Sequence, residues 1–213
     1  MKTNKQIMSK KDIQRILKTE DSTQIYREYM NKTNDIMLVD LGLTSGTLWA
    51  DRNIGADAPE QTGDYYRFGE IVAFTEDSPG YVYDKIKRDI AGTDMDAATM
   101  SLGTNYRMPT FNQIKELFDE CKWKWTKQNG AEGMKVTGPN DNSIFFPASG
   151  YRGDYNGSLN DVGLYGCYWS ASALNDYIGH AFDFHSGEWR SSCYGRAYGY
   201  PIRAVSGEFA TKN

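Results

Sequence analysis

Histidine and cysteine are scarce in this chain, which has only two histidines and three cysteines among its 213 residues. Such a supply leaves few ligands for a zinc site or a cysteine-rich metal cluster. The cysteines, Cys121, Cys167 and Cys193, form no CxxC pair, and their odd number argues against a disulfide scaffold. Buried free thiols are the simpler interpretation, with a single Cys121–Cys167 bridge as the alternative.

Long apolar runs and basic stripes are also missing. No segment approaches the roughly 18 apolar residues that cross a membrane, so we expect no membrane insertion. The N-terminal sequence MKTNKQIMSKKDIQRILKTED carries charges but no apolar core, so it predicts no secretory signal peptide. The net charge is −4 and the basic residues are dispersed, which makes nucleic acid an unexpected partner.

Aromatic residues and glycine are abundant, with 15 Tyr, 9 Phe, 5 Trp and 21 Gly. This composition favours a loop-rich fold that contains β-structure over a helix bundle. Tyrosine and tryptophan are also typical of binding surfaces, because they give large contact areas at a low entropy cost. The length fits one globular domain with a small accessory segment.

The order of local patterns divides the chain into three parts. Residues 1–35 are predicted to form a helical segment, with Ser9 as a cap before Ile13, Ile16 and Leu17 at helical spacing. This segment is either a docked helical hairpin or an assembly module through which the chain would form a homo-oligomer. Residues 36–206 form the expected main domain, and residues 207–213 form a polar tail.

Within the main domain, helical patterns come first and short strands follow. Thr110–Cys121 is the clearest helix, with Thr110 as its N-cap. Ile36–Leu43 and Thr47–Ala50 are predicted to pair as a hairpin. Further strands are expected at Lys135–Thr137, Ser143–Pro147, Tyr168–Ser172, His180–Phe184, Glu188–Arg190 and Pro201–Val205. Helices followed by a run of strands predict the α+β class.

Several ordered motifs carry a resemblance to a known family. They are VDLGL (39–43), LWADRNIGADAPEQTGDYYRFGE (48–70), YRMPTFNQIKEL (106–117), KVTGPNDNSIFFPASGYR (135–152), GCYWSAS (166–172) and YPIRAV (200–205). Together they resemble the Fibrobacter-type paralogous domain of gut Bacteroidetes over residues 36–206. The resemblance implies a C-type lectin fold related to that of the formylglycine-generating enzymes. It says little about function.

One branch of this broad family comprises the variable proteins of diversity-generating retroelements, in which error-prone reverse transcription randomises adenines in AAY codons. Randomising the first two bases of AAY cannot produce Glu, Gln, Lys, Met or Trp, so Glu188 and Trp189 are assigned to the scaffold. Every other position where plain relatives carry Asn-rich sequence holds a residue that the mechanism can reach. These predicted variable, ligand-binding positions are Ile178, Gly179, His180, Ala181, His185, Arg190, Ser191, Ser192, Cys193, Tyr194, Gly195, Ala197 and Tyr198.

The resemblance therefore implies a ligand-binding protein with a diversified C-terminal surface. Its ligand would be a variable protein or glycan on a cell surface, and it would act as a phage tail-tip or cell-surface adhesin. Phe182 and Phe184 alternate with polar residues and are expected to point into the core. Arg203 is expected to pair with a buried acid or carbonyl. The alternatives are a static structural or adhesin domain, and an enzyme of the formylglycine-generating type.

Catalytic and metal-binding patterns are not recognised. The EPN, QPD and WND motifs of calcium-dependent lectins are missing, and His180 and His185 lack the spacing of a zinc pair on a helix. Formylglycine-generating enzymes use two C-terminal cysteines, whereas Cys193 stands alone here. No Ser/His/Asp order or GxxxxGK[ST] loop occurs. We therefore expect no enzyme activity, no catalytic residue, no metal and no cofactor.

Overall fold

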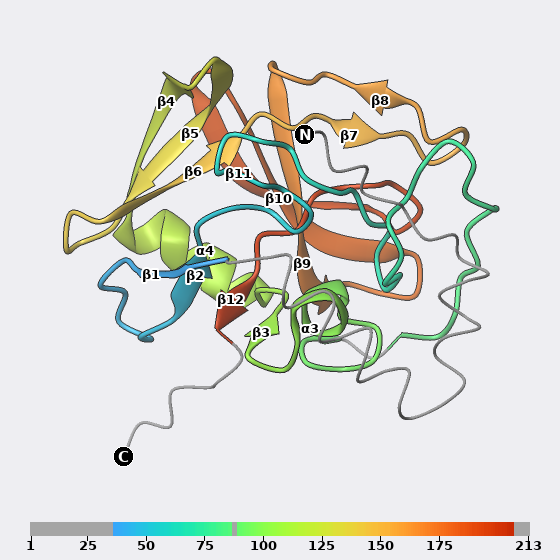
Figure 1. The fold of residues 1–213 in the computed structure, drawn as a ribbon. Helices are drawn as coiled ribbons and strands as arrows, with labels where there is room; N and C mark the ends of the chain where they lie inside the picture. Colours follow the sequence, from blue (N-terminus) through green and yellow to red (C-terminus); the bar gives the residue numbers. More distant parts are fainter. Residues whose placement is uncertain (1–35, 87–88, 207–213) are drawn as a thin grey trace, which may run out of the picture.

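The computed structural model describes residues 36–86 and 89–206. The predicted N-terminal helical segment and polar tail lie outside these ranges. Four small antiparallel sheets make up most of the regular structure (Figure 1). The first sheet contains, in spatial order, β1 (Leu38–Asp40), β2 (Leu48–Ala50), β12 (Val205–Ser206) and β3 (Tyr106–Arg107). The second contains β11 (Glu188–Gly195), β10 (Ile178–His185) and β9 (Tyr165–Ala173). The third contains β4 (Lys122–Gln128), β5 (Ala131–Thr137) and β6 (Ser143–Pro147), and the fourth pairs β7 (Tyr151–Arg152) with β8 (Leu159–Asn160).

The expectation of an α+β fold of the C-type lectin type is wrong, because the described residues are predominantly β. They contain only two short helices, α3 (Ala97–Leu102) and α4 (Phe111–Glu120). Both helices begin directly after a capping side chain, which is followed by apolar residues at helical spacing. Asp96 caps α3 by accepting hydrogen bonds from the backbone N–H groups of Ala98 and Thr99. Elsewhere, alternating apolar residues and glycine turns give short strands instead.

Helix α4 confirms the clearest helical prediction. The Thr110 hydroxyl accepts a hydrogen bond from the backbone N–H of Gln113 at 3.3 Å, and the Gln113 side chain accepts one from the backbone N–H of Thr110 at 3.0 Å. This reciprocal capping box fixes where the helix begins. Ile114 and Leu117 are fully buried, as the periodicity predicts. Helix α4 thereby packs one apolar side against the sheet formed by β9 and β10.

Strand β10 lies between β9 and β11, and its two faces enter two different cores. Phe182 and Phe184 point into the core shared with α4 and the β4–β5–β6 sheet. The Phe182 ring stacks on Tyr168 of β9, with centroids 5.2 Å apart. Ala181, on the opposite face, packs in a second core beside Trp169. The predicted inward orientation of both phenylalanines is confirmed.

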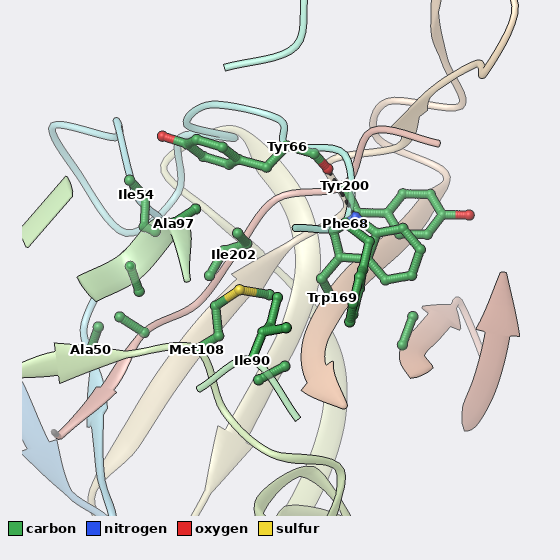
Figure 2. Close-up of a cluster of buried hydrophobic side chains, with 14 of the residues drawn as sticks. Ala50, Ile54, Tyr66, Phe68, Ile90, Ala97, Met108, Trp169, Tyr200 and Ile202 are labelled. Atoms are coloured by element: carbon green, nitrogen blue, oxygen red, sulfur yellow. Dashed lines mark hydrogen bonds between the residues drawn. The ribbon is translucent and has the colours of Figure 1, made fainter. Parts of the chain in front are cut away.

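The second core fixes the irregular segment that follows β2 (Figure 2). The Trp169 indole donates a hydrogen bond to the backbone carbonyl of Tyr66 at 2.8 Å. Its ring lies 5.4 Å from Phe68 and 4.4 Å from Tyr200, measured between centroids. Tyr66 and Tyr200 also exchange backbone hydrogen bonds of 2.9 and 3.0 Å. The irregular 53–69 segment is therefore ordered by contacts with the β9 tryptophan and the chain that follows β11.

The end of the described chain closes the first sheet. Val205 of β12 pairs with Trp49 of β2 on one side and with Arg107 of β3 on the other. Just before it, the buried Arg203 guanidinium donates hydrogen bonds to Asn53 Oδ1 and to the carbonyls of Ala50, Asp51 and Phe145 at 2.8–3.1 Å. The expected pairing of Arg203 with buried carbonyls is confirmed. Among the described residues, no helix is long and apolar enough to cross a membrane.

Candidate functional site

The predicted binding stretch forms a hairpin whose two strands differ in environment. Strand β10 is held between β9 and β11, whereas β11 is the outer strand of its sheet (Figure 1). The two strands pair without interruption from Ile178 opposite Gly195 to His185 opposite Glu188. The side chains of residues 188–191 and of Cys193 are exposed. A rigid inner strand thus carries an outer strand that is accessible from both faces.

Three of the predicted contact positions lie in the core, which corrects their assignment. Ala181 is fully buried and Ala197 is 8% exposed. Gly179 is also buried, and a Cβ atom there would lie 2.6 Å from the Phe68 ring and 3.0 Å from Trp169. Such separations allow no side chain without displacement of the aromatic core. Gly179, Ala181 and Ala197 therefore belong to the buried support of the surface.

One face of the hairpin, here called the helix face because His180 contacts α4, carries four predicted positions with side chains: Ile178, His180, Ser191 and Cys193. The His180 ring lies 4.4 Å from the ring of Phe111, the first residue of α4. The Cys193 thiol is 3.3 Å from His180 Nδ1. Desolvation lowers the pKa of His180 and raises the pKa of Cys193. The pair is therefore neutral at pH 7 and joined by a hydrogen bond.

Trp189 also lies on the helix face, at its outer end. Its ring is 41% exposed and stacks on Trp123 of β4, with centroids 6.0 Å apart and planes inclined by 11°. This contact agrees with the assignment of Trp189 to the scaffold, since it ties β11 to the neighbouring β4–β5–β6 sheet. The exposed part of the ring still offers a large rigid surface for contact.

The opposite face, here called the tyrosine face, carries His185, Arg190, Ser192 and Tyr194 around the side chain of Asp183. Arg190 Nε donates to Asp183 Oδ1 at 3.0 Å, and the Tyr194 hydroxyl donates to Oδ2 at 2.7 Å. The Ser192 hydroxyl also donates to Oδ2. The Tyr194 hydroxyl lies 3.1 Å from that of Tyr165, and burial raises the pKa of both phenols. These tyrosines are therefore neutral hydrogen-bonding groups.

Asp183 is the residue that sequence reasoning missed. The alternation Phe182-Asp183-Phe184 indicates correctly that the aspartate points away from the phenylalanines. That face is a core as well, so the whole Asp183 residue is only 1% exposed. Ala181 could have indicated this burial from the sequence, because a small apolar residue on the same face of β10 as Asp183 suggests that this face is also closely packed.

The remaining predicted positions lie where the hairpin joins its surroundings. Tyr198 is half-buried, and its ring lies 6.1 Å from that of Tyr151. Gly195 closes the strand opposite Ile178. The buried Arg196 then donates hydrogen bonds to the backbone carbonyls of Asp84 and Asp176, which fixes the β9–β10 turn next to the 75–86 loop. That turn presents Tyr177, which is 64% exposed.

The cysteines do not reproduce a two-thiol active site. All three are free, so the alternative Cys121–Cys167 bridge is not formed. Cys193 lies on the helix face opposite His180, whereas Cys167 of β9 lies opposite Asp183 on the other side of the sheet. Within residues 36–86 and 89–206, no group of three or more His, Cys, Asp or Glu residues is arranged to hold a metal ion.

Comparisons with family models, with curated proteins and with solved structures gave no match to this chain.

We expect iodoacetamide at pH 8 to alkylate Cys193 in the native protein while Cys167 stays unmodified. Thiolates are the reactive form, and Cys193 is exposed, whereas Cys167 is buried and its pKa is raised far above the usual value by desolvation. The labelling of Cys193 should be slower than that of an unstructured cysteine peptide, because desolvation raises the Cys193 pKa and lowers its thiolate fraction.

Peptide mass spectrometry after timed quenching measures this labelling, and the Cys193→Ser variant is the control. Cys121 should react more slowly than Cys193, because burial raises its pKa to about 11. Equal labelling of Cys167 and Cys193 in the folded protein would contradict this description of the site.

Proposed function

We propose that this chain is a ligand-binding protein whose contact surface is the β10–β11 hairpin. The observation that carries the proposal is the exposure of β11 on both faces while β10 is fixed between two cores. Binding proteins commonly present variable side chains on a rigid framework. The framework reduces the conformational entropy lost on binding, and the side chains can vary to suit different ligands. Tyr194, Tyr198, Tyr177 and Trp189 supply amphipathic anchors, and the serines and histidines supply polar contacts.

We further propose that a retroelement diversifies this surface. The support is the sequence resemblance together with the codon argument, since each exposed predicted position holds a residue reachable from AAY. Burial narrows the diversified set to Ile178, His180, His185, Arg190, Ser191, Ser192, Cys193, Tyr194, Gly195 and Tyr198. The ligand would be a protein or glycan on a cell surface, bound by a phage tail-tip or cell-surface adhesin. A static adhesin is the alternative with the same binding surface.

Sequencing the locus tests diversification. We expect a nearby template repeat that matches the coding sequence for residues 178–198 and differs from it at template adenines. The structure adds a finer expectation: codons 179, 181 and 197 should carry no AAY in the template, because all three residues are buried and position 179 has no room for a Cβ atom. Finding no repeat would refute diversification and favour the static adhesin. AAY at codon 179 would contradict the structural account of the variable set.

A displayed library tests ligand binding itself. Residues Arg190, Ser191, Ser192, Cys193 and Tyr194 would be randomised and selected against hen lysozyme as a model protein ligand. A matched library would randomise five positions on the exposed surface of α4 and β4, namely Lys115, Asp119, Lys122, Lys124 and Lys127. We expect specific binders from the β11 library and far fewer from the control. Equal yields from both libraries would show that β11 has no special capacity for recognition.

A further inference from the structure

The Asp183 carboxylate is a buried charge whose hydrogen-bond donors are surface residues. Its side chain is 2% exposed, whereas that of its ion-pair partner Arg190 is 61% exposed. The donors Arg190, Ser192 and Tyr194 alternate along β11, so all three point to the tyrosine face. One aspartate on the inner strand β10 thus accepts hydrogen bonds from three successive side chains on one face of the outer strand β11. Each of them is a predicted variable position.

Because the Asp183 carboxylate is buried, the folded state needs these hydrogen bonds to compensate for its lost hydration. A carboxylate removed from water is strongly destabilising unless hydrogen-bond donors or a cation compensate it. Tyr165 of β9 also hydrogen-bonds with Asp183, and its hydroxyl is 3.1 Å from that of Tyr194, but it provides no positive charge. An acidic residue at position 190, 192 or 194 would place a second negative charge beside Asp183. At Ser191, on the helix face of the same strand, no buried charge requires a hydrogen-bond donor, because its cross-strand partner Phe182 is apolar.

We infer that Asp183 is a positioning residue that restricts positions 190, 192 and 194 to hydrogen-bond donors and excludes acids from them, while positions 191 and 193 on the helix face carry no such restriction. As a statement about recognition, this rests on the proposed function. On the tyrosine face, the guanidinium and the phenol are held in one orientation before a ligand arrives, which reduces the entropy lost on binding. On the helix face, Ser191 and Cys193 are free to vary in chemistry. Strand β11 therefore combines three positions whose residue types are restricted by Asp183 with two positions, 191 and 193, that Asp183 does not restrict.

The test is a folding selection that needs no ligand, so its outcome is independent of whether the protein binds as proposed. A yeast-displayed library randomises positions 190, 192 and 194 together, and sorting retains the protease-resistant clones. A control library randomises positions 191 and 193 on the helix face of the same strand and keeps Trp189, which stacks on Trp123. Both libraries are built with Asp183 and again with Asp183→Asn, and sequencing gives the residue frequencies before and after sorting.

With Asp183, we expect Asp and Glu to be depleted about tenfold at positions 190, 192 and 194, with donors enriched, because an unpaired buried charge is strongly penalised. The Asp183→Asn background should remove the depletion of acids, since the amide is neutral and can donate to them. Equal depletion of acids on both faces with Asp183 would overturn the inference, even if Asp183→Asn fails to fold. Unchanged depletion in a folded Asp183→Asn library would overturn it as well.

Discussion

Replacing Phe182 with alanine is expected to lower the free energy of unfolding by about 3–5 kcal/mol. Phe182 is 1% exposed and lies where β9, β10 and the β4–β5–β6 sheet meet. Its ring stacks on Tyr168 at 5.2 Å and meets Phe146 edge-on at 5.3 Å. Rings packed on several sides cannot close around a missing phenyl group, so a cavity would remain.

Chemical denaturation monitored by tryptophan fluorescence measures this loss. The matched control is Ser191→Ala, because Ser191 is the direct cross-strand partner of Phe182 and is exposed. We expect the control to change the free energy of unfolding by less than about 0.5 kcal/mol. A similar effect from the two substitutions would mean that β10 is not held in the core as described.

Replacing Gly179 with asparagine is expected to destabilise the protein by about 3 kcal/mol, at the upper end of overpacking effects. Asparagine is the informative choice because an AAY template codon encodes it. Its Cβ atom would lie 2.6 Å from Phe68 and 3.0 Å from Trp169, and both aromatic rings are buried. The cost arises because neither ring can move without opening the second core.

The same measurement on Ser191→Asn supplies the control, since it adds the same side chain at an exposed position of the neighbouring strand. That variant should unfold within about 0.5 kcal/mol of the unaltered protein. If Gly179→Asn were equally harmless, position 179 would be open to diversification, and the narrowed set of contact positions would be wrong.

Local signals in the sequence were sufficient for several elements of the fold. The capping pattern at Thr110 located α4 to within a residue, and the alternation of Phe182 and Phe184 gave the orientation of β10. The fold class was not predictable in this way, because the short strands β3, β7 and β8 have two residues each. A two-residue strand has no period to detect, and it is defined by its partner in the sheet.

The candidate site shows a different limit. Arg190 and Ser191 are exposed, whereas Gly179 and Ala181 meet the same AAY codon criterion and are buried. Their size is set by Phe68 and Trp169, which come from distant parts of the chain. The role of Asp183 has the same origin, since its burial depends on a second core that the local alternation does not show.

Strand β12 has a consequence for how the protein folds during synthesis. It supplies the middle of a sheet whose other strands, β1, β2 and β3, are translated much earlier. Pairing of such distant segments is slow, because the chain entropy of loop closure must be overcome first. The ribosome completes the β10–β11 hairpin before Val205 emerges, so this hairpin exists in the nascent chain before the first sheet is closed. During that interval, unpaired strand edges are open to association with other chains.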